Sequence, residues 1–262
     1  MPHATDQYWS PCHEEYQKVL QIVEGPNERV IRFPLVVQPQ AKAESKDEVL
    51  REIRRIAAQP TDQSLQSELR QLLDAKGGVV HFKGLPLKTP DDFSDFLVAL
   101  SGQGIDKTDE SIPVWQRRGF NWTWQENGDL EVVHRVPGVR LHPTQNKPAI
   151  FNAMSTRYTN AKVNNTWNPP HTFKNEDGTG GVAIPPHFSG LEKDEPIPKQ
   201  WLERMDFYQH KLTADIKWEV GDVLVIDNYA AQHARWGWQG ERKILASFWD
   251  QPGYPTKPLV KV

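Results

Sequence analysis

Apolar residues recur with helical spacing in three segments of the first hundred residues. Ser45-Lys46-Asp47-Glu48 has the form of a capping box and opens the first of these helices, which Pro60 ends. A second helix is predicted from about Ser64 to Ala75 and a third from Thr89, with a strand over residues 79–84 between them. The first 40 residues are spaced by prolines and are expected to be irregular. The residues expected on the inner faces of the first and third helices are Val49, Ile53, Ile56, Phe93, Phe96, Leu97 and Leu100.

Helical spacing fades after Gly104, and short strand candidates replace it. A long polar loop is predicted over residues 155–197 and a short helix over 199–210. Helices first and short strands later favour an α+β chain built around a β-sandwich or barrel, taken as one domain over 1–262. Residues 1–104 form its helical and strand part, and residues 105–262 form its β-rich part. The strands predicted in the second part cover residues 130–133, 139–142, 149–154, 216–219, 222–226 and 243–249.

Composition removes several classes of function. The 262 residues carry a formal net charge of −3, so no basic excess indicates nucleic-acid binding. No apolar run approaches the roughly 20 residues of a membrane helix, and the N-terminus lacks a signal pattern, so a cytoplasmic protein is expected. Cys12 is the single cysteine, which rules out an intrachain disulfide and a cysteine-based zinc cage.

Candidate chemistry lies near the C-terminus. The stretch from Trp218 to Asn228 predicts a turn at Gly221 and a buried strand, and His233 and Arg242 follow. An imidazole and a guanidinium nine residues apart on adjacent antiparallel strands can face one pocket. Imidazole is a good ligand for iron or zinc, and guanidinium is a bidentate partner for a carboxylate.

This stretch resembles the C-terminal end of the taurine dioxygenase (TauD/TfdA) family, especially its clavaminate synthase-like fungal members. The segments 78–93 and 130–152, the latter with His142-Pro143 and Phe151-Asn152, resemble earlier parts of the same family. The resemblance implies a double-stranded β-helix (jelly-roll) core with N-terminal flanking helices. It also implies Fe(II) and 2-oxoglutarate chemistry, with His233 as the last iron ligand and Arg242 as the residue that holds 2-oxoglutarate.

The chain departs from the family at the first two iron ligands, which are a His-x-Asp or His-x-Glu pair. Of the nine histidines, only His13 has this spacing, with Glu15, and it precedes the family-like strand instead of following it. The chain therefore lacks the block that holds the paired ligands and some of the family's strands. No metal or cofactor is expected, and His233 is the ligand if a metal is bound at all.

Each candidate residue also has a plain structural interpretation. His233 is the candidate acid or base, and Arg242 is the candidate carboxylate partner. Asp227 and Asn228 are expected to form a turn, and His134 and His142 are expected to be ordinary strand histidines. The remaining candidates for substrate binding, whose aromatic members could equally fill the core, are Trp122, Trp124, Trp236 and Asn152.

Three functions stay open at this point. The first is a dioxygenase-like enzyme of small-molecule metabolism that has lost its iron site and performs cyclisation, isomerisation or elimination. Its likeness to fungal relatives suggests secondary metabolism. The second is an active oxygenase that uses Fe(II) and 2-oxoglutarate with unusual ligands. The third is a non-catalytic subunit that partners a complete paralogue. A homodimer or such a heterodimer is expected, because missing strands leave sheet edges with unpaired backbone groups.

Overall fold

The computed structural model divides into two compact units, each of which is described by itself. The first contains residues 1–110, 139–150 and 214–262, and the second contains residues 111–138 and 151–213. The prediction of a single domain over 1–262 stays a prediction. The residues that the structure describes are 8–24, 27–40, 45–62, 66–101, 120–124, 126, 128, 130–188, 193–241 and 243–247.

The first unit is built on a four-stranded sheet with the order β1-β4-β5-β14. The central strands β4 and β5 are parallel, and β1 and β14 pair antiparallel to them on either side. The chain passes from β4 to β5 through the helices α1 and α2. This unit also contains two hairpins, β2–β3 and β8–β9. Its strands are β1 (Trp9–Pro11), β2 (Lys18–Glu24), β3 (Asn27–Phe33), β4 (Leu35–Pro39), β5 (Val79–Phe82), β8 (Val139–Leu141), β9 (Pro148–Ile150) and β14 (Val223–Ile226).

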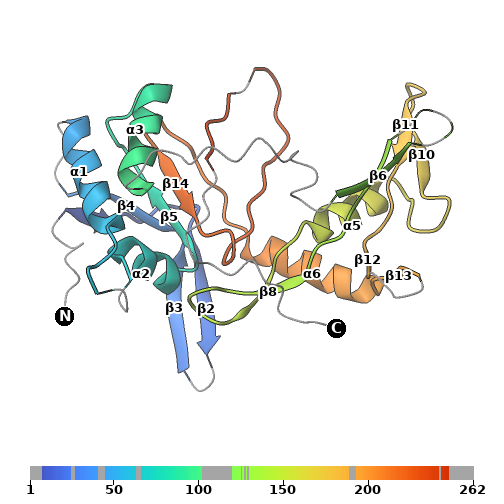
Figure 1. Cartoon of the computed structure of the whole chain (residues 1–262), viewed down its shortest axis with the longest axis horizontal. Helices are drawn as coiled ribbons and strands as arrows, with labels where there is room; N and C mark the ends of the chain where they lie inside the picture. Colours follow the sequence, from blue (N-terminus) through green and yellow to red (C-terminus); the bar gives the residue numbers. More distant parts are fainter. Residues whose placement is uncertain are drawn as a thin grey trace. The chain divides into compact units, whose positions relative to one another are not determined.

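Three helices pack on this sheet, and Figure 1 shows them gathered beside β4, β5 and β14. They are α1 (Lys46–Ala57), α2 (Glu68–Ala75) and α3 (Pro90–Ser101). Their apolar faces meet Val37, Val80, Phe82 and Val223 of the sheet in one hydrophobic core. The residues that the helices bury in this core are Val49, Leu50, Ile53, Ile56, Leu69, Leu73, Phe96 and Ala99.

The three N-terminal helices confirm the sequence pattern. The Ser45 hydroxyl accepts a hydrogen bond from the Glu48 N–H, as the capping box predicts. Thr89 does the same for the Asp92 N–H at the start of α3, at 3.1 Å. The second helix begins at Glu68, where the Ser67 hydroxyl accepts from the Arg70 N–H.

The expectation of an irregular N-terminus is wrong, because β1 to β4 lie within the first 40 residues. The hairpin β2–β3 runs in continuous register from Lys18 opposite Phe33 to Glu24 opposite Asn27. One of its faces is largely exposed, with Val19 and Val30 among its residues. Such a two-stranded ribbon needs only a short alternation of apolar and polar residues. The prolines among these strands make that alternation hard to recognise in the sequence.

The second unit is smaller and contains two helices with three hairpin pairs. Its elements are β6 (Phe120–Trp124), β7 (Leu130–His134), α5 (Met154–Val163), β10 (Thr172–Lys174), β11 (Gly180–Val182), β12 (His187–Phe188), β13 (Glu195–Pro196) and α6 (Lys199–Leu212). Its core is a cluster of Tyr158, Ile197 and Leu202, to which Met154, Trp167 and Met205 add partly buried contacts. The long polar loop predicted over 155–197 is therefore wrong. Helix α5 escapes sequence analysis because it buries only Tyr158 and Ala161, which leaves little apolar spacing to detect.

The chain is thus a mixed α and β protein with one larger sheet and several two-stranded ones. Within the described residues these sheets do not close into a barrel. Two predicted strands are absent: 216–219 and the described part of 243–249 are not strands. Ile244 and Leu245 are 58% and 43% exposed, so these two apolar side chains are not part of the core. No described helix is both long and apolar enough to cross a membrane.

Candidate functional site

The end of β14 is fixed by a turn at Asp227. The backbone N–H of Asp227 donates to the Gly78 carbonyl at 2.7 Å, and the Asp227 carboxylate accepts from the Tyr229 N–H at 2.9 Å. This is the side-chain-to-backbone bond that the turn prediction for Asp227 requires. Gly78 has a positive φ of +83°, and a Cβ atom there would lie 2.4 Å from the Cβ of Ala230. The turn therefore depends on a glycine in the neighbouring segment.

The Asp227 carboxylate also belongs to a buried cluster of charged and polar side chains. Arg70 Nη2 lies 2.5 Å from Asp227 Oδ2 and 2.5 Å from Asp74 Oδ1, so one guanidinium joins two carboxylates. His142 Nε2 lies 2.9 Å from the same Asp227 oxygen. Arg70 and Asp74 are one turn apart on α2, and His142 follows β8. The cluster therefore connects three separate segments of the first unit.

The loop after β8 determines which ring nitrogen of His142 carries the proton. The backbone N–H groups of Thr144 and Gln145 point at His142 Nδ1, at 3.3 and 3.2 Å. Nδ1 is therefore the acceptor, and the proton sits on Nε2, which donates to Asp227. Because both ring nitrogens are engaged and the ring is buried, this imidazole has no free lone pair.

Burial by itself would raise the pKa of the Asp227 carboxyl. The Arg70 guanidinium beside it, together with the hydrogen bonds from Tyr229 and Arg70 and the nearby His142, instead holds this pKa below its usual range. Asp227 is therefore an ionised carboxylate at neutral pH, although its side chain is only 5% exposed.

The residues predicted for binding and catalysis lie in both units. His233 is exposed after the Asp227 turn, and Arg242 lies outside the described residues. Trp236 is exposed and donates its indole N–H to Asp215 at 2.7 Å. In the second unit, Trp124 is 68% exposed, and Asn152 accepts from the Met154 N–H at the start of α5. The side chain of Trp122 lies outside the described residues.

The buried cluster is the part that sequence reasoning missed. The sequence predicts the turn at Asp227 but not its contacts with Arg70 and His142. It predicts an ordinary strand histidine at His142, whereas the structure gives His142 a charged partner. The available signal was the spacing of Arg70 and Asp74, which places both on one face of the second helix.

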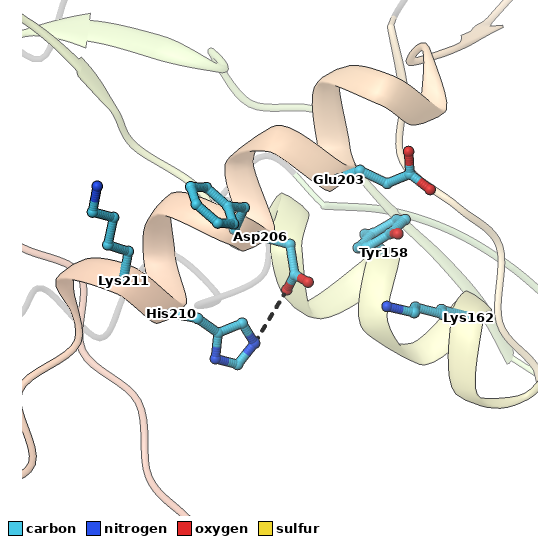
Figure 2. A pocket seen from close by; sticks show the side chains of 7 residues that line it. Tyr158, Lys162, Glu203, Asp206, His210 and Lys211 are labelled. Carbon is cyan, nitrogen blue, oxygen red and sulfur yellow. Dashed lines mark ion pairs between the residues drawn. The ribbon is translucent and has the colours of Figure 1, made fainter.

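The second unit contains a groove of about 570 Å³ between α5 and α6. Figure 2 shows Lys162 of α5 opposite Asp206 and His210 of α6, with the aromatic ring of Tyr158 beside them. His210 Nε2 lies 3.5 Å from Asp206 Oδ1. The groove thus presents both signs of charge beside the aromatic rings of Tyr158 and Phe207.

Comparison with known proteins identifies the class. The family model of the taurine catabolism dioxygenases, the TauD/TfdA family, matches residues 115–249. The chain belongs to this family. It is also similar to a clavaminate synthase-like protein of Arabidopsis thaliana, with 25% identity over 130 residues. That match covers 49% of this chain and 34% of the relative, so it spans about a third of the relative's length.

Members of this family normally depend on Fe(II) and 2-oxoglutarate, with a metal held by two histidines and one carboxylate. In the described part of the chain, Asp74, His142 and Asp227 each offer a ligand atom, and these atoms lie within 4.8 Å of one another. They do not fit a metal as they stand, because Arg70 already bridges the two carboxylates and both nitrogens of His142 are engaged. The pair with His-x-Glu spacing, His13 and Glu15, is exposed, and Glu15 pairs with Lys217 at 3.5 Å.

Proposed function

We propose that this chain is a dioxygenase-like enzyme of small-molecule metabolism, of the kind found in fungal secondary metabolism, in which no iron centre of the family type is assembled. Its chemistry on this proposal is redox-neutral: a cyclisation, isomerisation or elimination. Its core derives from the family's jelly roll and lacks some of that fold's strands.

The observation that carries the proposal is the position of Arg70. Its guanidinium lies 2.5 Å from an oxygen of each carboxylate in the group that comes nearest to a metal site. A divalent cation and a guanidinium compete for the same oxygens and repel each other. Binding a metal there would also require a proton to move to the side of His142 that faces the N–H groups of Thr144 and Gln145.

In this proposal the family's C-terminal residues keep roles in binding and proton transfer. His233 is the acid or base, since its imidazole is exposed and histidine is the side chain most often used for proton transfer. Arg242 is the partner of an acidic group on the substrate. Trp122, Trp124, Trp236 and Asn152 are the further candidates for contacts with the substrate.

Anaerobic Fe(II) loading, followed by elemental analysis and an assay of 2-oxoglutarate consumption, tests the proposal. We expect far less than one iron per chain and no consumption of 2-oxoglutarate. About one iron per chain together with turnover contradicts the proposal. Once a substrate is found, His233→Ala should abolish turnover and retain binding, and Arg242→Ala should weaken binding by about 1.5–3 kcal/mol.

A second candidate function is an active oxygenase with unusual ligands. The closeness of the ligand atoms of Asp74, His142 and Asp227 favours it. In that case iron binding by the wild-type chain should disappear in His142→Ala and remain in His210→Ala, which removes a histidine of the second unit. The same pair of variants therefore separates a specific site from adventitious iron.

A further inference from the structure

A second buried chain of hydrogen bonds lies on the sheet, centred on His81 of β5. Val80 and Phe82 face the helices in the core, so the alternation of a strand turns His81 to the opposite face. His81 Nδ1 lies 2.7 Å from the hydroxyl of Tyr16, and Nε2 lies 3.0 Å from Asp222 Oδ2. The side chains of His81 and Asp222 are fully buried. The chain thus ties together the segment after β1, the middle of β5 and the turn before β14.

The neighbours of Asp222 determine where the protons lie. Its carboxylate also accepts from the backbone N–H groups of Gly84, at 3.2 Å, and Glu219, at 3.1 Å. Since backbone N–H groups point at both oxygens of Asp222, its carboxyl group acts as an acceptor, and His81 donates its Nε2 proton to it. Nδ1 of His81 then carries a lone pair, which accepts the hydroxyl proton of Tyr16.

Several other groups face this imidazole. Trp218 covers it from the turn before β14, with ring centroids 5.9 Å apart. Lys83, which directly follows β5, lies nearby and is paired with Glu14, at 3.2 Å, and with Glu219, at 3.6 Å. Burial lowers the pKa of His81 and Lys83 lowers it further, while Asp222 and Glu14 oppose the shift without cancelling it. His81 therefore stays neutral at neutral pH.

We propose that Tyr16, His81 and Asp222 form an acid-sensitive latch, in which uptake of one proton at Nδ1 of His81 ends the hydrogen bond that Tyr16 donates, places a cation beside Lys83 and loosens residues 12–17 from β5. A proton on Nδ1 would point at the hydroxyl proton of Tyr16, so Tyr16 must rotate that proton away and can then only accept from Nδ1. The new cation also faces Lys83, which holds Glu14 of the same segment.

An NMR titration of the imidazole nitrogens tests the latch directly. In the wild-type chain we expect His81 to carry its proton on Nε2 at neutral pH and to titrate below the ordinary histidine pKa of 6.5. Backbone signals of residues 12–17 should change with the same midpoint as the His81 ring. Tyr16→Phe removes the donor to Nδ1, so the midpoint of His81 should rise. An unchanged midpoint in Tyr16→Phe, or a wild-type His81 that titrates at or above pH 6.5, overturns the proposal.

His81→Gln supplies an independent readout, because its amide can still donate to Asp222 but does not titrate. Since the pKa of His81 is lowered in the folded chain, its neutral form supports the fold above the ordinary value of 6.5, and this support falls as the pH drops below that value. Below pH 6.5, the ratio of folded to unfolded wild-type protein should therefore fall by up to about tenfold for each pH unit. His81→Gln should lack this part of the loss, and an equal slope in both proteins contradicts the latch. If His81→Gln does not fold, the titrations of the wild type and Tyr16→Phe still decide.

Discussion

Replacing Arg70 by methionine removes the cation between two buried carboxylates and keeps most of the side-chain volume. The Arg70 side chain is 13% exposed and that of Asp227 is 5% exposed, so water replaces little of the lost interaction. Removing one partner of a buried ion pair costs about 3–5 kcal/mol. Asp227 keeps the hydrogen bonds from His142 and Tyr229, and Arg70 Nε has no acceptor among the described residues, so a loss near the lower end, about 3 kcal/mol, is expected.

Arg55→Met is the matched control. Arg55 also contacts two carboxylates, those of Glu52 and Glu68, but its side chain is 38% exposed. Exposed pairs of this kind contribute about 1 kcal/mol or less. Urea unfolding at neutral pH measures the free energy of unfolding of both variants. In thermal unfolding, a loss of about 3 kcal/mol of this free energy lowers Tm by roughly 6–12 °C for a chain of this size. A loss in Arg70→Met no larger than that in Arg55→Met refutes the assigned role of the cluster.

The pH dependence checks the same reasoning. Because the pKa of Asp227 is lowered in the folded chain, its ionised form stabilises the fold above the unfolded value of about 3.9. This stability is lost as the pH falls through the folded pKa. The difference in the free energy of unfolding between the wild type and Arg70→Met should therefore be largest at neutral pH and should become smaller below about pH 4. The double variant Arg70→Met with Asp227→Asn should lose less free energy of unfolding than the sum of the losses of the two single variants, because Asp227→Asn removes the unpaired charge.

Two further predictions concern the strand β14. Gly221→Ala should destabilise the fold by a few kcal/mol more than Gly84→Ala. Both positions have a positive φ, but only at Gly221 would a Cβ atom meet backbone, 2.0 Å from the Leu85 carbonyl oxygen. Urea unfolding measures the free energy of unfolding of both variants, and equal losses contradict the prediction. The chain should also associate, most simply as a dimer, since among the described strands β14 pairs only with β5 and its four residues carry no charge that would block a further strand. Light scattering over a range of concentrations checks this, and a monomer at every concentration refutes it.

The sequence predicts those elements whose own residues determine them. Capped helices such as the one after Ser45 form from local contacts, and the strand at Val223–Ile226 is a short apolar run that begins beside a glycine turn. The hairpin of the first 40 residues and helix α5 were not predicted, because prolines or weak apolar spacing hide the pattern. Residues 243–247 carry a strand-like pattern, but they find no partner strand among the described residues.

The candidate cluster could be predicted only in part, because it is made by residues far apart in the chain. The turn at Asp227 follows from local chemistry, since an aspartate bonds the backbone two residues on. Nothing near Asp227 in the sequence indicates that Arg70 and His142 meet it. Those contacts depend on α2 and the loop after β8 reaching the same end of β14, which is a property of the packed unit.

The two aspartates that flank β14 explain how so short a strand is held at its place in the sheet. Asp222 at its start is bound by His81, and Asp227 at its end is bound by His142 and Arg70. Among the described strands, β14 pairs with β5 alone and over four residues, which fixes it only weakly, so the buried side-chain bonds at both ends supply what a second neighbour would otherwise give. Both aspartates belong to the stretch that resembles the C-terminal end of the family. In this chain they are anchors of the strand.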